Sequence, residues 1–428
     1  MAPSSTGDVL CDPLRQKFVD ILNSNGIWDE VDNVVMTEPP ELKGEHMATA
    51  TVYLRYEFKD KEVKDKNLFV KKFTSNPAHT AFVKKGRIME KEMSFFTEFL
   101  PKAREFCGKY AGCEKLLDLF PKCWYADEEM VVLENLVLDD TFIMLDKEVK
   151  QDLFTAKLVL GNLAKFHAAT YAFIEEECGG SEKFAELYEC QCFEAFMQEN
   201  DPMMEPMFDN GATTCINLLK GHPVEGDAEA VETLTSYMGK SYPLVTSIVK
   251  LNHSEKLLVL NHGDFHNNNM LFKKDAETGR VNDHVFVDLQ ITRLGSPNLD
   301  IGYYMYTSVQ PKIRRAHFME LLRHYYDTFE TTVGMFGGKK CPISYEDFVA
   351  DYRIKSQMGF FTTLSFIAAM GALKDIDMET MSEDPVDMME IFNTAIRNWI
   401  ANNPEKAAAI AEEVVAVVKE HGQVSGPI

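Results

Sequence analysis

Three polar residues in one short stretch of the chain have the types and spacing needed for chemistry on a phosphate group. The stretch covers residues 258–290, LVLNHGDFHNNNMLFKKDAETGRVNDHVFVDLQ, and contains Asp264, Asn269 and Asp288. Asn269 and Asp288 offer an amide oxygen and a carboxylate, and Mg²⁺ in proteins takes one or two such ligands together with phosphates and water. Asp264, in a turn, could accept the proton of an attacking hydroxyl. Together these groups are the minimum equipment for phosphoryl transfer from a nucleotide.

Two other interpretations of this stretch remain open. Every residue of NHGDFHNNN is common in turns, so the segment could be an ordinary solvated turn. Alternatively, His262, Asp264 and His266 occupy alternating positions and could bind zinc or iron from one face of an extended strand. Gly263 within the turn argues against a regular strand, and the chain supplies no matching histidine cluster elsewhere.

A lysine near the start of the chain could anchor the phosphates of such a nucleotide. Lys71 ends the apolar run of NLFVK, and a lysine that reaches from a buried strand into a cleft neutralises phosphate charge if a carboxylate orients it. Glu92, on the next predicted helix, is the first choice for this carboxylate, and Glu90 is the second. A glycine-rich phosphate loop is poorly supported, because only Gly44 directly precedes the first predicted strand. Backbone amides could still approach phosphate at the small residues Ala48, Thr49 and Ala50.

The elements that would position these residues divide the chain into two parts. Residues 1–133 contain lead-in helices, several short runs of alternating apolar residues typical of an antiparallel sheet, and one helix. The helical segments of this part are predicted at residues 10–35 and 82–100, and the strands at 47–58, 67–73, 116–124 and 129–133. Residues 134–428 are mostly helical, and only the catalytic loop at 258–290 interrupts the helices with strands. We therefore predict an α+β fold with a small β-rich N-terminal lobe and a larger helical C-terminal lobe that carries a catalytic hairpin.

The helices of the second part are predicted from apolar periodicity at residues 150–177, 183–197, 228–251, 312–329, from 345 onward, and from 404 to a stop at Gly422. The two lobes join at a short crossover whose backbone groups could hydrogen-bond the edge of a purine. This crossover consists of Glu134, Asn135 and Leu136. A cleft at such a join is where small-molecule sites tend to form.

Composition restricts the possible partners. The 428 residues include 44 Lys and Arg against 67 Asp and Glu, which gives a net charge of −23 and disfavours nucleic acid and anionic membranes as partners. The nine cysteines are irregularly spaced, so we expect no disulfide framework, and we expect ordinary thiols at Cys190 and Cys192 rather than a metal site. We also expect no signal peptide and no membrane span, and hence a cytoplasmic protein.

The motifs resemble a known family. His262–Asn269 reads H-G-D-x-x-x-x-N and Val287–Gln290 reads V-D-x-Q, which resembles the aminoglycoside phosphotransferase and choline kinase superfamily of protein-kinase-like folds. More narrowly, HGDFHNNNMLF, VDLQITRLGSPNLDIGYYMYTS and LAKFHAATYA are similar to the ecdysteroid kinase-like family, also called CHK kinase-like. The likeness extends from about residue 44 to about residue 329.

This resemblance implies an ATP:alcohol phosphotransferase, a small-molecule kinase that uses ATP and Mg²⁺. The acceptor hydroxyl would belong to an ecdysteroid, another steroid, a xenobiotic alcohol or a choline-like compound. The implied roles are catalytic base for Asp264, Mg²⁺ ligands for Asn269 and Asp288, phosphate anchor for Lys71, its partner for Glu92, and structural support of the loop for His262, Asp300 and His167.

The chain departs from the family pattern at two positions. His266 stands where the family usually has tryptophan, and Leu289 stands where it often has phenylalanine. His266 would lie at the mouth of the cleft, so the departure bears on acceptor preference. The alternative function is a catalytically silent relative that binds a nucleotide or a small ligand. The complete set of polar residues argues against it, because a degraded relative should have lost at least one of them.

Overall fold

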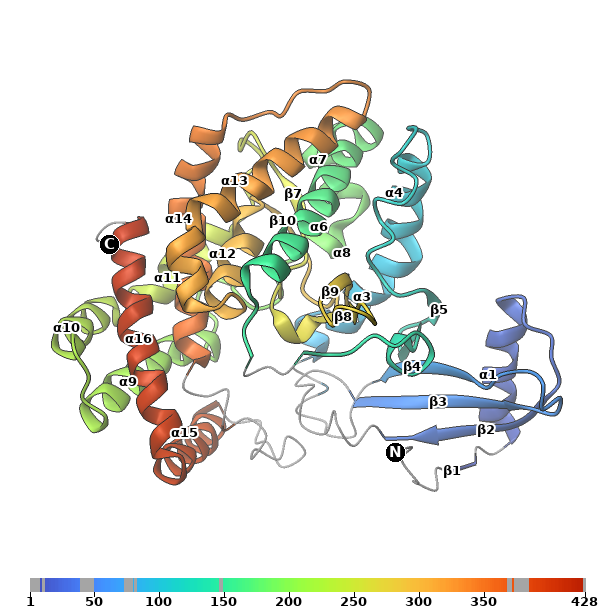
Figure 1. The fold of residues 1–428 in the computed structure, drawn as a ribbon, viewed down its shortest axis with the longest axis horizontal. Helices are drawn as coiled ribbons and strands as arrows, with labels where there is room; N and C mark the ends of the chain where they lie inside the picture. The colour runs from blue at the N-terminus through green and yellow to red at the C-terminus, as the bar shows by residue number, and fades with distance from the viewer. Residues whose placement is uncertain are drawn as a thin grey trace.

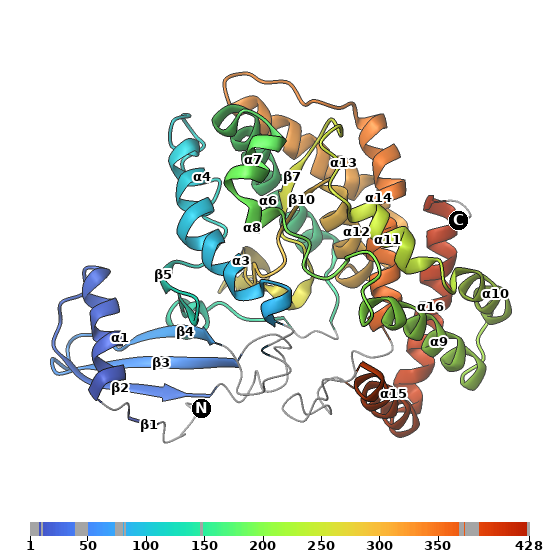
Figure 2. The ribbon, with the colours of Figure 1, turned by 180° about the vertical axis from the view of Figure 1, so that it is seen from behind.

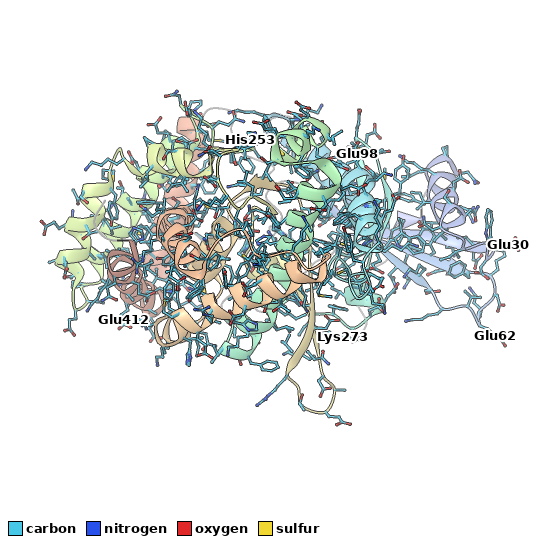
Figure 3. The ribbon with its side chains drawn as sticks, turned by 90° about the horizontal axis from the view of Figure 1, so that it is seen from above. Glu30, Glu62, Glu98, His253, Lys273 and Glu412 are labelled. Atoms are coloured by element: carbon cyan, nitrogen blue, oxygen red, sulfur yellow. The ribbon has the colours of Figure 1, made fainter. Side chains whose placement is uncertain are left out.

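The computed structural model describes residues 8–9, 12–38, 50–72, 80, 83–145, 149–367, 372 and 385–425. A sheet with one helix lies at one end of the molecule, and a large helical body forms the rest (Figure 1). Seen from above, Glu30 and Glu62 mark the outer end of the sheet, and Glu412 lies on the helical body at the opposite end (Figure 3). The predicted α+β fold, with a small β-rich lobe and a larger helical lobe, is confirmed.

The described strands of the N-terminal part form one antiparallel sheet in the order β1-β2-β3-β4-β6-β5. The strands are β1 (Asp8–Val9), β2 (Val31–Thr37), β3 (Ala50–Phe58), β4 (Lys66–Lys72), β5 (Cys123–Ala126) and β6 (Met130–Glu134). Alternate residues of β3, from Val52 to Phe58, are buried, as the two-residue period of a strand requires. They form a core with Phe18, Ile21 and Leu22 of α1 (Asp12–Ser24).

A nearly continuous helix connects the sheet to the helical body. It consists of α3 (Ile88–Ser94), the π-helical turn η2 (Phe95–Phe99) and α4 (Leu100–Cys107). Pro101 has no N–H to donate, and the wider turn before it, in which Leu100 N donates to Phe95 O, lets the helix continue past the proline. The apolar faces of these helices, including Phe95 and Phe99, pack into the main core of the helical body.

Thirteen helical segments and the 3₁₀ turn η4 (Asn267–Asn269) build the described remainder of the chain, apart from two short strand pairs. The thirteen segments are α5 (Leu136–Asp139), α6 (Leu153–Ala172), η3 (Phe173–Cys178), α7 (Ser181–Leu187), α8 (Glu189–Cys192), α9 (Met204–Gly221), α10 (Asp227–Tyr237), α11 (Ser241–Val249), α12 (Asn298–Thr307), α13 (Pro311–Met335), α14 (Tyr345–Phe366), α15 (Pro385–Asn402) and α16 (Pro404–Ser425). The central helix α6 is buried around most of its circumference, which accounts for its lack of a polar stripe. None of the helices in the described ranges has the length and apolar character of a membrane span.

Helices α12 and α14 cross unusually closely, and this crossing positions part of the site. A Cβ on Gly359 of α14 would lie 2.4 Å from the backbone nitrogen of Tyr303 in α12. A Cβ on Gly302 would lie 2.6 Å from the Cα atom of Ser356. Only glycine at both positions permits this approach, which fixes the position of Tyr303.

The stretch at residues 258–290 forms parts of two antiparallel pairs. Strand β7 (Val259–Asn261) pairs with β10 (Arg293–Gly295), and β8 (Met270–Lys274) pairs with β9 (Val281–Phe286). The β8–β9 hairpin projects from the helical body, and Lys273 marks it in Figure 3. Between β7 and β8 lies the turn of residues 262–269, which ends in the 3₁₀ turn η4 (Asn267–Asn269).

Several predicted element boundaries were wrong. Residues 31–37 form strand β2 and not a continuation of the lead-in helix, since Gly26, with φ of +84°, ends α1 and reverses the chain. Most of residues 116–124 form turns, and a strand begins only at Cys123; the apolar run is explained by burial of Leu117 and Leu119 in the core. The single helix predicted at residues 228–251 is two helices, α10 and α11.

The remaining differences have local causes. Gly239, with φ of +71°, separates α10 from α11, and residues 183–197 contain only the short helices α7 and α8. Gly422 does not end the last helix, because α16 continues to Ser425. Gly44 and parts of predicted segments, at residues 10–11, 47–49, 73 and 82, lie outside the described residues.

Candidate active site

The turn between β7 and β8 brings Asp264 and Asn269 together. The Asn269 side-chain amide donates to Asp264 Oδ2 at 2.9 Å and to the Asp264 carbonyl oxygen at 2.9 Å. The turn depends on Gly263, which has φ of +89° and whose Cβ would lie 1.9 Å from the Ile291 carbonyl oxygen. Because the Asn269 amide nitrogen is directed to Asp264, its Oδ1 faces away and is available as an acceptor.

Asp300 supports this turn from beneath. Its carboxylate accepts hydrogen bonds from the backbone N–H groups of His262, at 2.7 Å, and of Gly263, at 2.9 Å. His167 also donates to Asp300 through Nε2, at 3.3 Å, and accepts from the Tyr325 hydroxyl at 2.7 Å. Burial keeps the pKa of His167 below its ordinary value despite the nearby Asp300 carboxylate, so the ring is neutral in this arrangement.

A buried trio of charged side chains lies at the junction of the two lobes. Lys71 Nζ on β4 contacts Glu92 Oε1 on α3 at 2.9 Å and Asp288 Oδ1 at 3.0 Å. Lys71 and Glu92 are fully buried, whereas the Asp288 side chain is 18% exposed. Burial lowers the pKa of Lys71, but Asp288 and Glu92 outweigh it and raise the value. Burial and the Asp288 charge raise the pKa of Glu92, and Lys71 opposes the shift.

Backbone contacts connect the trio to the turn. The His262 Nε2–H donates to the Val287 carbonyl at 2.9 Å, and the Val287 N–H donates to the Asn269 carbonyl at 3.0 Å. Asp288 directly follows Val287 and has φ of +70°, an uncommon conformation for a residue with a side chain. The turn and the trio therefore belong to one site.

The Asp264 carboxylate has two further neighbours. His266 Nε2 lies 3.5 Å from Asp264 Oδ2, and the Tyr303 hydroxyl is close enough to the Asp264 carboxylate that burial and this carboxylate together raise the pKa of Tyr303. Burial favours the protonated carboxyl, but His266, His262 and the Asn269 amide outweigh it and hold the pKa of Asp264 below its usual range. Burial lowers the pKa of His266, but the Asp264 and Asp288 charges raise it above its ordinary value overall. Asp264 is thus ionised and oriented from three sides.

Sequence reasoning did not identify Tyr303. It belongs to the aromatic run YYMY in α12, and nothing in that run distinguishes it from tyrosines of a helical core. Its place beside Asp264 results from the close crossing of α12 and α14, a long-range packing feature. A mutual contact between the His266 and Tyr303 rings, with centroids 5.8 Å apart, places both on the same side of Asp264.

The crossover between the lobes has one backbone donor left for a ligand. The N–H groups of Glu134 and Asn135 donate to the carbonyls of Lys122 and Asn67, at 2.9 and 3.3 Å, and the Asn135 side chain caps α5. In the described part of the chain, no acceptor contacts the N–H of Leu136. An apolar cluster adjoins it, made of Leu136, Phe142 and Val285 with Leu271 and Val287 at its edge.

The second choice of carboxylate for Lys71, and the cysteine pair considered as a metal site, both lie apart from the trio. Glu90 pairs with Arg87 on the surface, and it does not contact Lys71, because two residues along a helix correspond to about 200° of rotation. Cys190 and Cys192 are free thiols, as are the other described cysteines.

The residues present fit Mg²⁺ better than zinc. Across the described residues, no group of three or more His, Cys, Asp and Glu side chains is arranged to hold a metal ion. His262 uses its Nε2 on the Val287 carbonyl, so the zinc arrangement with Asp264 and His266 is not supported. Asn269 Oδ1 and the Asp288 oxygen that does not contact Lys71 are hard oxygen donors, the sparse set that Mg²⁺ uses beside phosphates.

A family model described as the ecdysteroid kinase-like family matches residues 43–338, more than half of the chain. The chain belongs to the ecdysteroid kinase-like family, as the motifs of the sequence predicted. Comparison with curated proteins gives no match.

Solved structures that match this chain include proteins described as small-molecule kinases. An ethanolamine kinase from Plasmodium vivax is 13% identical, with 89% of this chain and 85% of that chain covered and a TM-score of 0.42. A choline kinase from Cryptosporidium parvum is 12% identical, with 95% and 99% covered and a TM-score of 0.43. An aminoglycoside 2'-phosphotransferase-IIIa in complex with GDP is 12% identical, with 91% and 99% covered and a TM-score of 0.37.

Proposed function

We propose that this protein is an ATP-dependent phosphotransferase that phosphorylates a hydroxyl group of a small molecule. The observation that carries the proposal is the continuity of the site. The Lys71–Glu92–Asp288 trio is joined through Val287 to the turn that holds Asp264. A cation for phosphates, oxygen ligands for a metal and an ionised carboxylate for a hydroxyl thus meet within one network.

The nucleotide would lie between the lobes. Lys71, oriented by Glu92, would bind the phosphates, and Asn269 and Asp288 would hold the metal ion. When bound, Mg²⁺ neutralises phosphate charge, which matters in a protein with a net charge of −23. Leu136 offers the free backbone N–H at the crossover, and the adjoining apolar cluster would cover one face of the purine. We place the boundary between the lobes at residues 133 and 134, where β6 leads into this crossover.

Asp264 would orient the acceptor hydroxyl and take up its proton. Because the pKa of Asp264 lies below its usual range, the carboxylate is a weak base and an effective hydrogen-bond acceptor. It would therefore hold the hydroxyl in line with the terminal phosphate and accept the proton late in the transfer. The Asn269 amide, which contacts the same oxygen as His266, fixes the direction of the carboxylate.

The acceptor would approach Asp264 from the side of His266 and Tyr303. Both side chains offer a polar atom and a ring face, which suits a hydroxylated compound with an apolar skeleton such as an ecdysteroid, another steroid or a xenobiotic alcohol. A choline-like acceptor would bring its cation toward the same side chains. The described cysteines are free thiols, which favours a reducing compartment such as the cytoplasm for this reaction.

The proposal is tested by identifying a product. The purified protein is incubated with γ-labelled ATP, Mg²⁺ and a small-molecule metabolite extract, and labelled compounds are separated and identified by mass spectrometry. We expect label on the hydroxyl of an organic compound in the wild type and none with Lys71→Met. If the wild type labels nothing although thermal shift shows that it binds Mg·ATP, the protein is a silent nucleotide-binding relative and the proposal is wrong.

A further inference from the structure

A second buried lysine, on α3, directly precedes the active-site glutamate in the sequence and takes no part in the chemistry described above. Lys91 is fully buried, and its Nζ donates to the carbonyl oxygens of Cys190 and Thr292, each at 2.7 Å. Burial lowers the pKa of Lys91 to about 8. A buried ammonium group is costly unless its hydrogen bonds are provided, so a lysine here implies a specific binding arrangement.

Gln191 completes this arrangement from the opposite side. Its amide nitrogen donates to the Lys91 carbonyl at 2.9 Å and to the Ser94 hydroxyl at 2.6 Å. Its amide oxygen accepts from the Thr292 hydroxyl at 2.6 Å. Gln191 is 1% exposed and Thr292 is fully buried, so water does not compete for these contacts.

These contacts join three segments that are far apart in the sequence. Lys91 belongs to α3, Gln191 to the short helix α8, and Thr292 to the segment that follows Asp288 and leads into β10. Helix α8 lies against both α3 and β10, and α3 and α8 are seen together from behind in Figure 2. An ion pair between Arg293 and Glu194, at 3.2 Å, adds a further link between the segments after α8 and at β10.

The joined segments are the ones that carry the active-site trio. Glu92 is the next residue after Lys91, and its Oε1 accepts from the backbone N–H of Leu289 at 3.3 Å. Neighbouring residues on a helix point about 100° apart, so Lys91 faces α8 and β10 while Glu92 faces Lys71. A rotation of α3 that moved Lys91 off its two carbonyls would withdraw Glu92 from Lys71 as well.

We propose that Lys91, Gln191 and Thr292 are positioning residues that form a clamp, which locks α3 in the orientation that joins Glu92 to Lys71. The clamp rests on the proposed function, because its purpose is to keep the phosphate anchor ready for the nucleotide. In protein kinases the corresponding Lys–Glu pair must be assembled by movement of its helix, which is a point of control. Here the buried clamp keeps the pair assembled without a partner or a modification.

The expected effect follows from population arithmetic. If loss of the clamp leaves only about a tenth of the molecules with Glu92 in place, the apparent affinity for Mg·ATP falls about tenfold. Saturating nucleotide draws the remaining molecules into the competent state, so kcat changes much less than KM for ATP. KM for the acceptor should stay within about twofold of wild type, because Asp264 is held by a separate set of contacts.

The test compares Lys91→Met and a matched pair at position 292. Lys91→Met keeps the length of the side chain but removes its donors; Thr292→Val removes the hydroxyl, and Thr292→Ser retains it. We expect a roughly tenfold rise in KM for ATP with Lys91→Met, a smaller rise with Thr292→Val and none with Thr292→Ser. Lys102→Met, at a side chain 65% exposed on α4, serves as the surface control and should match wild type.

Hydrogen exchange of the α3 amides in the protein without nucleotide gives a readout that needs no activity. Exchange should be faster in Lys91→Met and Thr292→Val than in wild type and Thr292→Ser, and Mg·ATP should restore protection. Unchanged exchange and unchanged KM for ATP in both variants would overturn the clamp. The clamp would also be overturned if kcat fell and the KM values for ATP and for the acceptor rose by similar factors, because that result indicates general destabilisation of the fold. A wild type that neither binds nor uses ATP would overturn the proposed function instead, and exchange would still decide whether the clamp holds α3.

Discussion

Removal of the Lys71 charge should destabilise the protein strongly and in a way that depends on pH. In the native protein the Lys71 ammonium group contacts the carboxylates of Glu92 and Asp288 at 2.9 and 3.0 Å. Lys71→Met removes this cation and leaves the two carboxylates facing each other. Glu92 has no exposed surface in its side chain, so water cannot replace the lost cation. Breaking a buried ion pair by removal of one partner costs about 3–5 kcal/mol.

The double variant Lys71→Met/Glu92→Gln should be more stable than the single variant. It removes the fully buried negative charge together with the cation, and the remaining Asp288 side chain reaches solvent. Replacement of both members of a buried pair by neutral groups of similar volume is often close to neutral. We therefore expect the second substitution to recover about half or more of the loss.

Acid should also restore stability to the single variant. Glu92 already has a raised pKa in the native protein, and loss of Lys71 raises it further. A carboxyl whose folded pKa exceeds its unfolded value stabilises the folded state when protonated, and this contribution is lost as pH rises through the folded pKa. The deficit of Lys71→Met should therefore shrink as the pH is lowered from 7 to 5, and that of the double variant should not.

Urea denaturation at both pH values measures these effects. With a slope of about 3 kcal/mol per M, a loss of 3–5 kcal/mol lowers the midpoint of Lys71→Met by about 1–2 M at pH 7. Lys61→Met, at a side chain 74% exposed, is the matched control and should unfold near the wild-type midpoint. A single variant as stable as wild type, or less stable than wild type but no worse than the double variant at either pH, would refute the reasoning.

The remaining predictions concern the metal, the turn and the pH dependence of the whole fold. Asp288→Ala should abolish the Mg²⁺-dependent part of the thermal shift produced by ATP, and a full Mg²⁺ effect would contradict its role as a ligand. Gly263→Ala, whose Cβ would meet the Ile291 carbonyl, should lower Tm far more than Gly279→Ala, which shares a positive φ but has open space around it. Equal decreases in Tm would mean that the cost comes from the positive φ and not from the contact with Ile291. Burial lowers the pKa of His284 from 6.5 to about 4, so wild-type stability should fall as pH drops from about 6.5 toward 4, by up to about 1.4 kcal/mol per pH unit for this group. His284→Phe should make that dependence less steep in urea titrations at pH 7, 6 and 5, with the rest due to groups such as His421, whose pKa burial also lowers to about 4; an unchanged slope would exclude a contribution from His284.

The parts of the fold that the sequence predicts well are those governed by local rules. The alternating apolar residues of β3 predict a half-buried strand because a strand has a period of two, and the long apolar periodicity of α6 predicts a helix. The predicted boundaries failed where burial and turn chemistry compete. Leu117 and Leu119 are buried in irregular turns, and an apolar run alone does not distinguish such turns from a strand.

The candidate site divides in the same way. The spacing of Asp264 and Asn269 within one turn makes their proximity predictable. The structure also brings Lys71 into contact with Glu92, the first choice of carboxylate for it. The distinction between Glu92 and Glu90 depends on which face of α3 points inward, and a seven-residue helix gives too short a pattern to decide it.

Other site residues were beyond the reach of local patterns. Tyr303 approaches Asp264 only because glycines in α12 and α14 let the two helices cross closely. Lys91 is indistinguishable in sequence from the exposed lysines around it, and its burial depends on carbonyl groups contributed by α8 and by the segment before β10. Such contacts between distant segments are decided by tertiary packing.

The central claim is that Asp264 acts on the acceptor hydroxyl and not on the nucleotide. Asp264→Asn keeps the size of the side chain, and the most direct test measures its kcat with the acceptor identified from the labelled extract and, by calorimetry, its Kd for Mg·ATP. We expect kcat to fall by about 10²–10⁴ while Kd stays within about threefold of wild type. An unchanged kcat, or a loss of activity explained entirely by weaker nucleotide binding, would contradict the account.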